Sequence, residues 1–213
     1  MVLFVHRALI IPAAFKASAV MENWINFPTV VLLSIGLFWL LLSDSRRSIV
    51  VAYSVVVIVV FSINIQFWTF GFALSKLITA LMAMLILILS PSSRDLQEER
   101  AMRTGRIFRA AGLVFFMLMI VFTIGDSAKF LSLSIDQTLP ALFILVCGFL
   151  LIGTAHEPFN VIIGLMTILV GFEIIYGSVE QSLLINGLLA AVFLVIAVVG
   201  SYLISSTEST DQQ

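Results

Sequence analysis

The chain has 213 residues, of which 61% are hydrophobic and 11% are charged, and its formal net charge at pH 7 is −1. Its mean hydropathy is +1.17, which excludes an ordinary soluble globular domain. The near-zero net charge argues against a large basic surface for nucleic acid. The single cysteine, Cys147, excludes an intrachain disulfide and argues against a zinc or iron–sulfur site.

Seven apolar runs near the length of a membrane crossing follow one another along the chain. The runs are continuous rather than alternating, which predicts helices, because a segment in lipid must satisfy its own backbone polar groups. The predicted fold class is therefore an all-α polytopic membrane protein with about seven spans, its N-terminus outside and its C-terminus cytoplasmic. The predicted spans are 27–43, 48–63, 67–89, 107–125, 139–155, 159–177 and 183–204.

The residues before the first span, 1–20, form an apolar run that a proline interrupts and that is too short to cross a membrane. Three interpretations are open: the true start is Met21, the stretch is an interfacial amphipathic helix, or it is a signal peptide cut after Ala19. The membrane domain is predicted over residues 21–204. The polar residues 205–213 are expected to form a disordered tail.

The orientation follows from arginines that concentrate in the loops on one side of the predicted spans. The first loop contains Arg46 and Arg47, and five further arginines lie between positions 94 and 109. Because Lys and Arg mark cytoplasmic loops, loops one, three and five are predicted to be cytoplasmic. The charged stretch 95–103 is expected to be a short solvated helix rather than a binding site.

Lys76 lies inside the third predicted span, roughly 13 Å from its outer end at 1.5 Å per residue. Thr79, Ala80 and Ala83 share its helical face, and small residues allow close helix packing, so this face is expected to contact protein. A charge at the bilayer centre costs roughly 2.5–3.5 kcal/mol on insertion scales, which makes Lys76 a candidate functional residue. The alternative is that its side chain extends to the outer interface near Trp68.

Glu173 lies in the outer half of the sixth predicted span. A buried carboxyl group that exists both protonated and ionised near neutral pH is what a proton relay needs. Glu180 follows seven residues later on the same face and Tyr176 lies near that face, so both are further candidates. The alternative is a protonated Glu173 that bonds a neighbouring helix and has no transport role.

The evidence for a functional role is weaker for the other polar residues in or near the spans. Asn186 opens the seventh span and is followed by small residues at helical spacing, so it is a candidate for a relay or for a packing position. Asn64 and Gln66 are predicted to lie in a short outer turn without a special role. The sequence contains no phosphate-binding loop, no Cys/His cluster and no nucleophile motif, so no catalytic site, cofactor or metal is expected.

Two short motifs resemble those of known membrane-protein families. The last three spans, within 139–204, resemble the K subunit of respiratory complex I and the C subunit of Mrp-type antiporters, because Gly171-Phe172-Glu173 matches their Gly-Leu-Glu-type motif. The chain from Met21 onward is similar to the E subunit of hydrogenase-4-type complexes, and Ser75-Lys76-Leu77 matches its Thr-Lys-Val-type segment. Those families have an acidic residue in the last helix where this chain has Asn186, so a two-carboxylate relay is not implied.

The resemblance implies a non-catalytic integral-membrane subunit of a complex I-like or membrane-bound hydrogenase-like complex in the prokaryotic plasma membrane. Glu173 would take part in proton or sodium translocation, Lys76 would adjust its ionisation, and antiporter-like membrane subunits would be partners. The chain itself would bind no flavin, cluster or quinone. Two alternatives stay open: a stand-alone small transporter or channel, and a structural assembly subunit without ion traffic.

Overall fold

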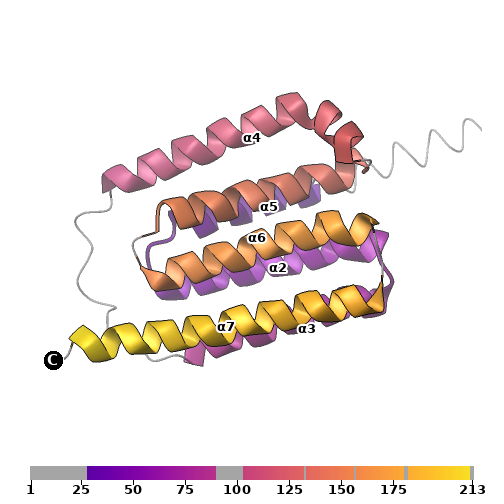
Figure 1. The fold of residues 1–213 in the computed structure, drawn as a ribbon. Helices are drawn as coiled ribbons and strands as arrows, with labels where there is room; N and C mark the ends of the chain where they lie inside the picture. Colours follow the sequence, from indigo (N-terminus) through magenta and orange to yellow (C-terminus); the bar gives the residue numbers. More distant parts are fainter. Residues whose placement is uncertain (1–27, 90–102, 132, 156, 180–181, 212–213) are drawn as a thin grey trace, which may run out of the picture.

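The computed structural model describes residues 28–89, 103–131, 133–155, 157–179 and 182–211. The described part is all-α, as predicted, and its helices lie side by side (Figure 1). They are the first helix (Pro28–Leu42), α2 (Arg46–Phe67), α3 (Phe70–Leu89), α4 (Arg103–Leu131), α5 (Ile135–Gly153), α6 (Pro158–Val179) and α7 (Leu183–Asp211). Residues 1–20, 95–102 and Glu180, for which predictions were made, are not among the described residues.

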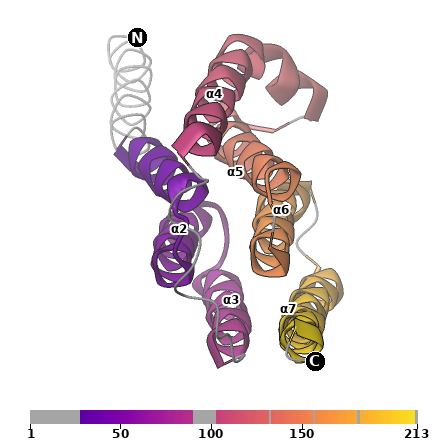
Figure 2. The same cartoon turned by 90° about the vertical axis from the view of Figure 1, so that its left-hand side faces the viewer.

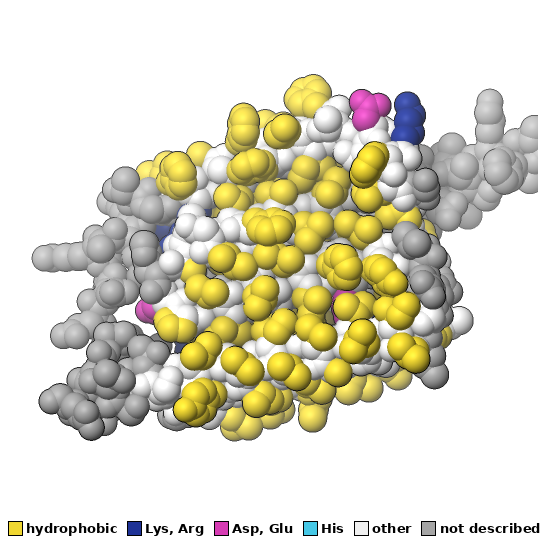
Figure 3. Space-filling view, in the orientation of Figure 1, with side chains coloured by type: hydrophobic (Ala, Val, Ile, Leu, Met, Phe, Trp, Pro, Cys, Tyr) yellow, Lys and Arg dark blue, Asp and Glu magenta, His cyan; other side chains and the backbone are white. Residues whose placement is uncertain are grey.

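Six of these helices, α2 to α7, are long and apolar enough to cross a membrane, and the first helix is shorter. Large apolar side chains cover the face seen in Figure 3. On α4, for example, Phe122 and Phe130 are 87% and 88% exposed. Apolar surface on this scale would be unfavourable in water and is expected against lipid or partner helices. The chain is therefore a multi-pass membrane protein.

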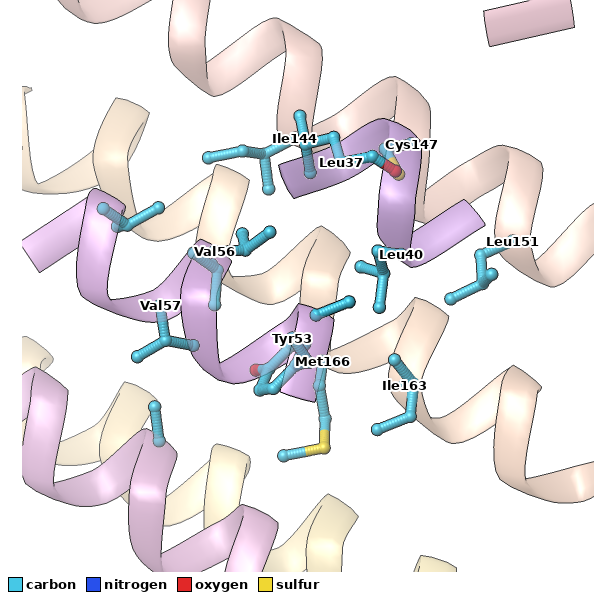
Figure 4. Close-up of a cluster of buried hydrophobic side chains, with 14 of the residues drawn as sticks. Leu37, Leu40, Tyr53, Val56, Val57, Ile144, Cys147, Leu151, Ile163 and Met166 are labelled. Carbon is cyan, nitrogen blue, oxygen red and sulfur yellow. The ribbon is translucent and has the colours of Figure 1, made fainter. Parts of the chain in front are cut away.

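The helices form two layers. The first helix, α2 and α3 make up one layer, and α4 to α7 make up the other (Figure 2). The layers meet where α2 contacts α6 and α3 contacts α7, and the thiol of Cys147 on α5 lies 3.6 Å from the carbonyl oxygen of Leu37 on the first helix. Figure 4 shows the buried apolar core between the layers, which includes Leu37, Ile144 and Met166.

The seam between α5 and α6 is built on glycines. A methyl group at Gly148 would lie 2.8 Å from the backbone nitrogen of Ile168, and one at Gly164 would lie 3.1 Å from the carbonyl oxygen of Gly148. A methyl group at Gly171 would likewise lie 3.1 Å from the backbone nitrogen of Leu145. Only residues without a side chain allow two helices to approach this closely, which is a common packing device in membranes.

Arginine side chains gather at one end of the bundle, the arginine end. Asp44, between the first helix and α2, forms ion pairs with Arg106 at 2.7 Å and with Arg109 at 3.6 Å. Arg109 also donates to the carbonyl oxygen of Thr154 at 3.0 Å, and Arg46 donates to that of Leu87 at 2.8 Å. The predicted clustering of these arginines on one side of the spans is confirmed. The opposite end, where Trp68 joins α2 to α3, is the tryptophan end.

Several helices extend beyond the ends that hydropathy predicts. α2 continues to Phe67, so the prediction that Asn64 and Gln66 lie in a turn was wrong. α7 continues to Asp211, so the expected disordered tail is helical through most of its length. Residues 201–211 contain neither glycine nor proline. The backbone hydrogen bonding of the helix therefore continues past the point where the apolar residues end.

Candidate functional site

Lys76 and Glu173 form an ion pair inside the bundle. The distance from Nζ of Lys76 on α3 to Oε1 of Glu173 on α6 is 2.8 Å, and the two side chains are only 9% and 11% exposed. Lys76 lies six residues after the start of α3, and Glu173 lies six residues before the end of α6. At 1.5 Å per residue both are therefore about 9 Å from the tryptophan end, and not the roughly 13 Å expected from the sequence.

Small residues on α3 allow the face of the helix that carries Lys76 to pack against neighbouring helices. Ala80 and Ala83, one and two turns after Lys76, are buried at 7% and 0% exposure. α3 packs against α2 and α7, so the lysine side chain extends into the bundle interior and not toward lipid. The expectation that this face contacts protein is confirmed. Nζ is buried and lies beside Trp68, so the side chain extends toward the tryptophan end, as the alternative expected, but does not reach the surface of the bundle.

Trp68 covers the pair on the side of the tryptophan end. The Nζ atom of Lys76 lies 5.3 Å from the centroid of its ring, within the range of a cation–π interaction. The indole packs directly on the backbone of Gly177, where a methyl group would overlap the ring. The Trp68 backbone is extended, and its N–H donates to the carbonyl oxygen of Asn64 at 2.8 Å. Gly177 therefore makes room for the ring that shields the charges.

Two small cavities adjoin the pair. The inner cavity, between α2, α3, α6 and α7, has a volume of about 30 Å³, and its lining includes Asn64, Thr79 and Asn186. The end cavity, beside Trp68, has a volume of about 20 Å³. Lys76, Glu173 and Asn186 line both cavities. Because a water molecule needs roughly 10–15 Å³ on this measure, each cavity has room for one or two waters.

The pair is held mainly by charge. Although Nζ of Lys76 lies 2.8 Å from the carboxylate, it makes no well-aligned hydrogen bond to any described residue. The nearby hydroxyl of Thr79 donates to the backbone carbonyl of Ser75 at 2.8 Å. The hydroxyl of Ser75 donates to the backbone carbonyl of Phe72, also at 2.8 Å. The ammonium group therefore has donors to spare that face the cavities, where water is a suitable acceptor.

The structure brings together four of the five residues that the sequence singles out. Lys76 and Glu173 are in direct contact, and Asn186 and Tyr176 line the cavities beside them. Tyr176 also stacks on Phe172, with ring centroids 5.7 Å apart. Glu180 lies outside the described residues. No group of three metal-ligating acidic, histidine or cysteine side chains occurs within the described part of the chain.

Three contributors to the site were not identified from the sequence. Trp68 was noted only as an interface residue, Gly177 was assigned no role, and Asn64 was placed in a turn. Asn64 is in fact 6% exposed and lines the inner cavity. The available signal for Asn64 was an amide side chain close after the long apolar run of α2. The contact between Trp68 and Gly177 depends on helix packing and has no local signal.

Comparisons of the chain with known protein families, with characterised proteins and with solved structures find no match. The resemblance to the hydrogenase-4-type, complex I and Mrp-type subunits therefore stays a prediction from two short motifs. What the chain does must be argued from the buried pair and its surroundings.

Proposed function

We propose that the chain is a non-catalytic subunit of an ion-translocating membrane complex, and that Lys76 and Glu173 are its proton-exchange site. The observation that supports this proposal is the 2.8 Å contact between an amine and a carboxylate that are both withdrawn from solvent. Intramembrane charges are costly and are retained mainly where they move charge or bind a charged partner. Sodium is the alternative ion, for which Glu173 would be the ligand.

The pair supports proton exchange because its two partners can trade a proton. In a poorly solvated site, the charged pair and the neutral amine–acid pair are closer in free energy than they are in water. When a proton binds the Glu173 carboxylate, Lys76 loses its counter-ion, and the ammonium then releases its own proton more readily. One proton enters at the carboxylate and one leaves from the amine, which leaves a neutral acid beside a neutral amine. Transfer of the proton from the acid to the amine then restores the ion pair.

The cavities support the same role. A proton reaches a buried group through water or through side chains that both donate and accept hydrogen bonds. The inner and end cavities meet at Lys76, Glu173 and Asn186. Asn186 cannot take up and release a proton, but its amide can orient water on both sides of the pair. The site is thus a single exchange point rather than a chain of carboxylates.

The proposed partners rest on the motif resemblance. Ser75-Lys76-Leu77 and Gly171-Phe172-Glu173 lie in separate parts of the sequence, and the fold places their charged residues against each other. The proposal includes antiporter-like neighbouring subunits, a complex I-like or hydrogenase-like assembly, and the prokaryotic plasma membrane with the arginine end in the cytoplasm. Redox chemistry would take place in other subunits.

The test compares two single variants with the double variant in native membranes. Glu173→Gln or Lys76→Met alone leaves a buried unpaired charge, which we expect to cost about 3–5 kcal/mol of stability and to reduce assembly. The double variant removes both charges and should restore assembly, measured on native gels. Proton pumping by the assembled complex, measured with a pH-sensitive dye, should stay low in the double variant.

A surface pair provides the matched control. Asp126 and Lys129 are 3.9 Å apart and more than 80% exposed, so Asp126→Asn with Lys129→Met should change neither assembly nor pumping. If the Lys76/Glu173 double variant assembles and pumps normally, the pair only holds helices together and the proposal is wrong. Proton conduction by the purified chain alone in liposomes would favour the stand-alone transporter instead.

A further inference from the structure

Tyr53 has a buried hydroxyl group for which the packing provides no partner. The residue is 1% exposed, and its Oη atom makes no hydrogen bond to any part of the chain that the structure describes. Leaving a buried hydroxyl unpaired is unfavourable, and such groups usually bond to water or serve a function. Figure 4 shows the side chain beside Met166, with the hydroxyl turned toward the Val57 side of α2.

Tyr53 lies one helical turn beyond the part of α2 that lines the inner cavity. The cavity lining on α2 extends from Asn64 back to Val57, and Tyr53 is one helical turn further on the same face. On α6, Met166 and Glu173 are seven residues apart and therefore share a face. One continuous interface thus connects Tyr53 with the ion pair.

The neighbouring hydroxyl and thiol groups are already engaged. Ser54 donates to the carbonyl oxygen of Val50 at 2.9 Å, and Thr167 donates to that of Ile163 at 2.7 Å. The thiol of Cys147 faces the carbonyl of Leu37 on the first helix. Among the described residues in this middle section of the bundle, Tyr53 therefore has the hydroxyl that is available for a mobile proton.

Further buried polar atoms lie at the arginine end of the bundle. Tyr53 lies seven residues after the start of α2, which is about 10 Å along the helix. At that end, Oδ1 of Asn160 in the first turn of α6 and Oδ1 of Asp44 are both buried and without a hydrogen bond among described groups. The charged groups there include Asp44, Arg106 and Arg109. Along the bundle, Tyr53 therefore lies between the arginine end and the pair.

We propose that Tyr53 is a proton-relay residue that connects the Lys76–Glu173 pair with the arginine end of the bundle. The inference rests on the proton-exchange role proposed above and adds a route to it. A tyrosine hydroxyl is both a donor and an acceptor. It accepts a proton from a protonated water on the side of the arginine end while it releases its own proton to water in the inner cavity, so one O–H bond forms as another breaks. Tyr53 itself stays neutral overall.

The experiment follows protonation of Glu173 from each face of the membrane. The assembled complex is reconstituted in one orientation, which a cysteine introduced between α3 and α4 reports by labelling. The pH is stepped on one face, and the infrared band of the protonated carboxyl group is recorded with time. The band is assigned by its loss in the Glu173→Gln/Lys76→Met double variant, which is expected to assemble. Tyr53→Phe should slow the response to a step at the arginine end by at least about tenfold.

The same variant should leave the response to a step at the tryptophan end unchanged, which a general structural defect would not do. Tyr202→Phe is the matched control, because Tyr202 is 72% exposed, and it should respond as the parent chain does from both faces. An unchanged rate from the arginine end in Tyr53→Phe would overturn the relay and leave the exchange role intact. A band at Glu173 that responds to neither face would overturn both proposals.

Discussion

The two sides of α6 make opposite kinds of contact. Toward α5, Gly164 and Gly171 bring the backbones together with no space for a side chain. Toward α3 and α7, Glu173 meets Lys76 beside two cavities. Glu173 follows Gly171 by two residues, which is about 200° around a helix. One side of the helix is therefore fixed by tight packing, while the other presents a charge to a space that accommodates water.

This contrast explains how a charge can be kept in position without a full set of hydrogen bonds. The site itself is loosely packed, and Nζ of Lys76 has no well-aligned partner in the described structure. Position must therefore come from the scaffold, and the α5–α6 seam provides it because two helices in close backbone contact move little relative to each other. The two regions should respond differently to the same chemical change, the addition of one methyl group to a glycine.

The larger effect is expected at the tight seam. Gly148→Ala would place a methyl group 2.8 Å from the backbone nitrogen of Ile168, and backbone atoms cannot turn aside. The helices must separate, which we expect to cost about 1–3 kcal/mol of unfolding free energy, measured by thermal or denaturant unfolding in detergent. Gly153→Ala, a helix-end position with nothing within 4 Å, is the matched control. Equal stability of the two variants would contradict the tight seam.

A smaller effect on stability, but a local effect on the site, is expected from Gly177→Ala. The methyl group would overlap the Trp68 ring, which is a side chain at a turn and can move away. The net change in stability should be within about 1 kcal/mol, because alanine is the better helix former. The displaced indole should become more accessible to a water-soluble quencher, measured by fluorescence with Trp24 and Trp39 replaced by phenylalanine.

Gly187→Ala is the control for this second comparison, because it also lies in a helix next to the site but has nothing within 4 Å. Its Trp68 quenching should match that of the parent chain. If Gly177→Ala also leaves quenching unchanged, Trp68 does not rest on Gly177, and the proposed cover over the ion pair is absent.

The sequence predicts the helices well, because continuous apolar runs between polar loops can satisfy their backbone only as helices in lipid. It predicts their ends less well, since hydropathy marks where apolar residues stop and not where the helical backbone hydrogen bonds stop. Asn64 was misplaced for this reason: it is polar, but α2 continues through it to Phe67. The helical residues after Ile204 were missed in the same way.

The two central residues of the site were identifiable individually, because a charge in an apolar run is conspicuous. Their contact was not, since it depends on which helices become neighbours. The helices are apolar around most of their circumference, so periodicity does not reveal their packing partners. Tyr53 and Gly177 were missed for a related reason. A tyrosine or a glycine is common in membrane helices, and only the packing shows that one hydroxyl lacks a partner and one glycine supports an indole.

The central claim is that Lys76 and Glu173 touch inside the membrane. Solid-state NMR on the full chain in lipid bilayers, with ¹⁵N-labelled lysine and ¹³C-labelled glutamate, measures this contact directly. The lysines are Lys16, Lys76 and Lys129, so a Lys76→Arg variant assigns the signal. We predict a close Nζ–carboxyl contact that disappears in both Lys76→Arg and Glu173→Gln. A Lys76 amine that correlates with water or lipid headgroups, and with no glutamate carboxyl, would contradict the account.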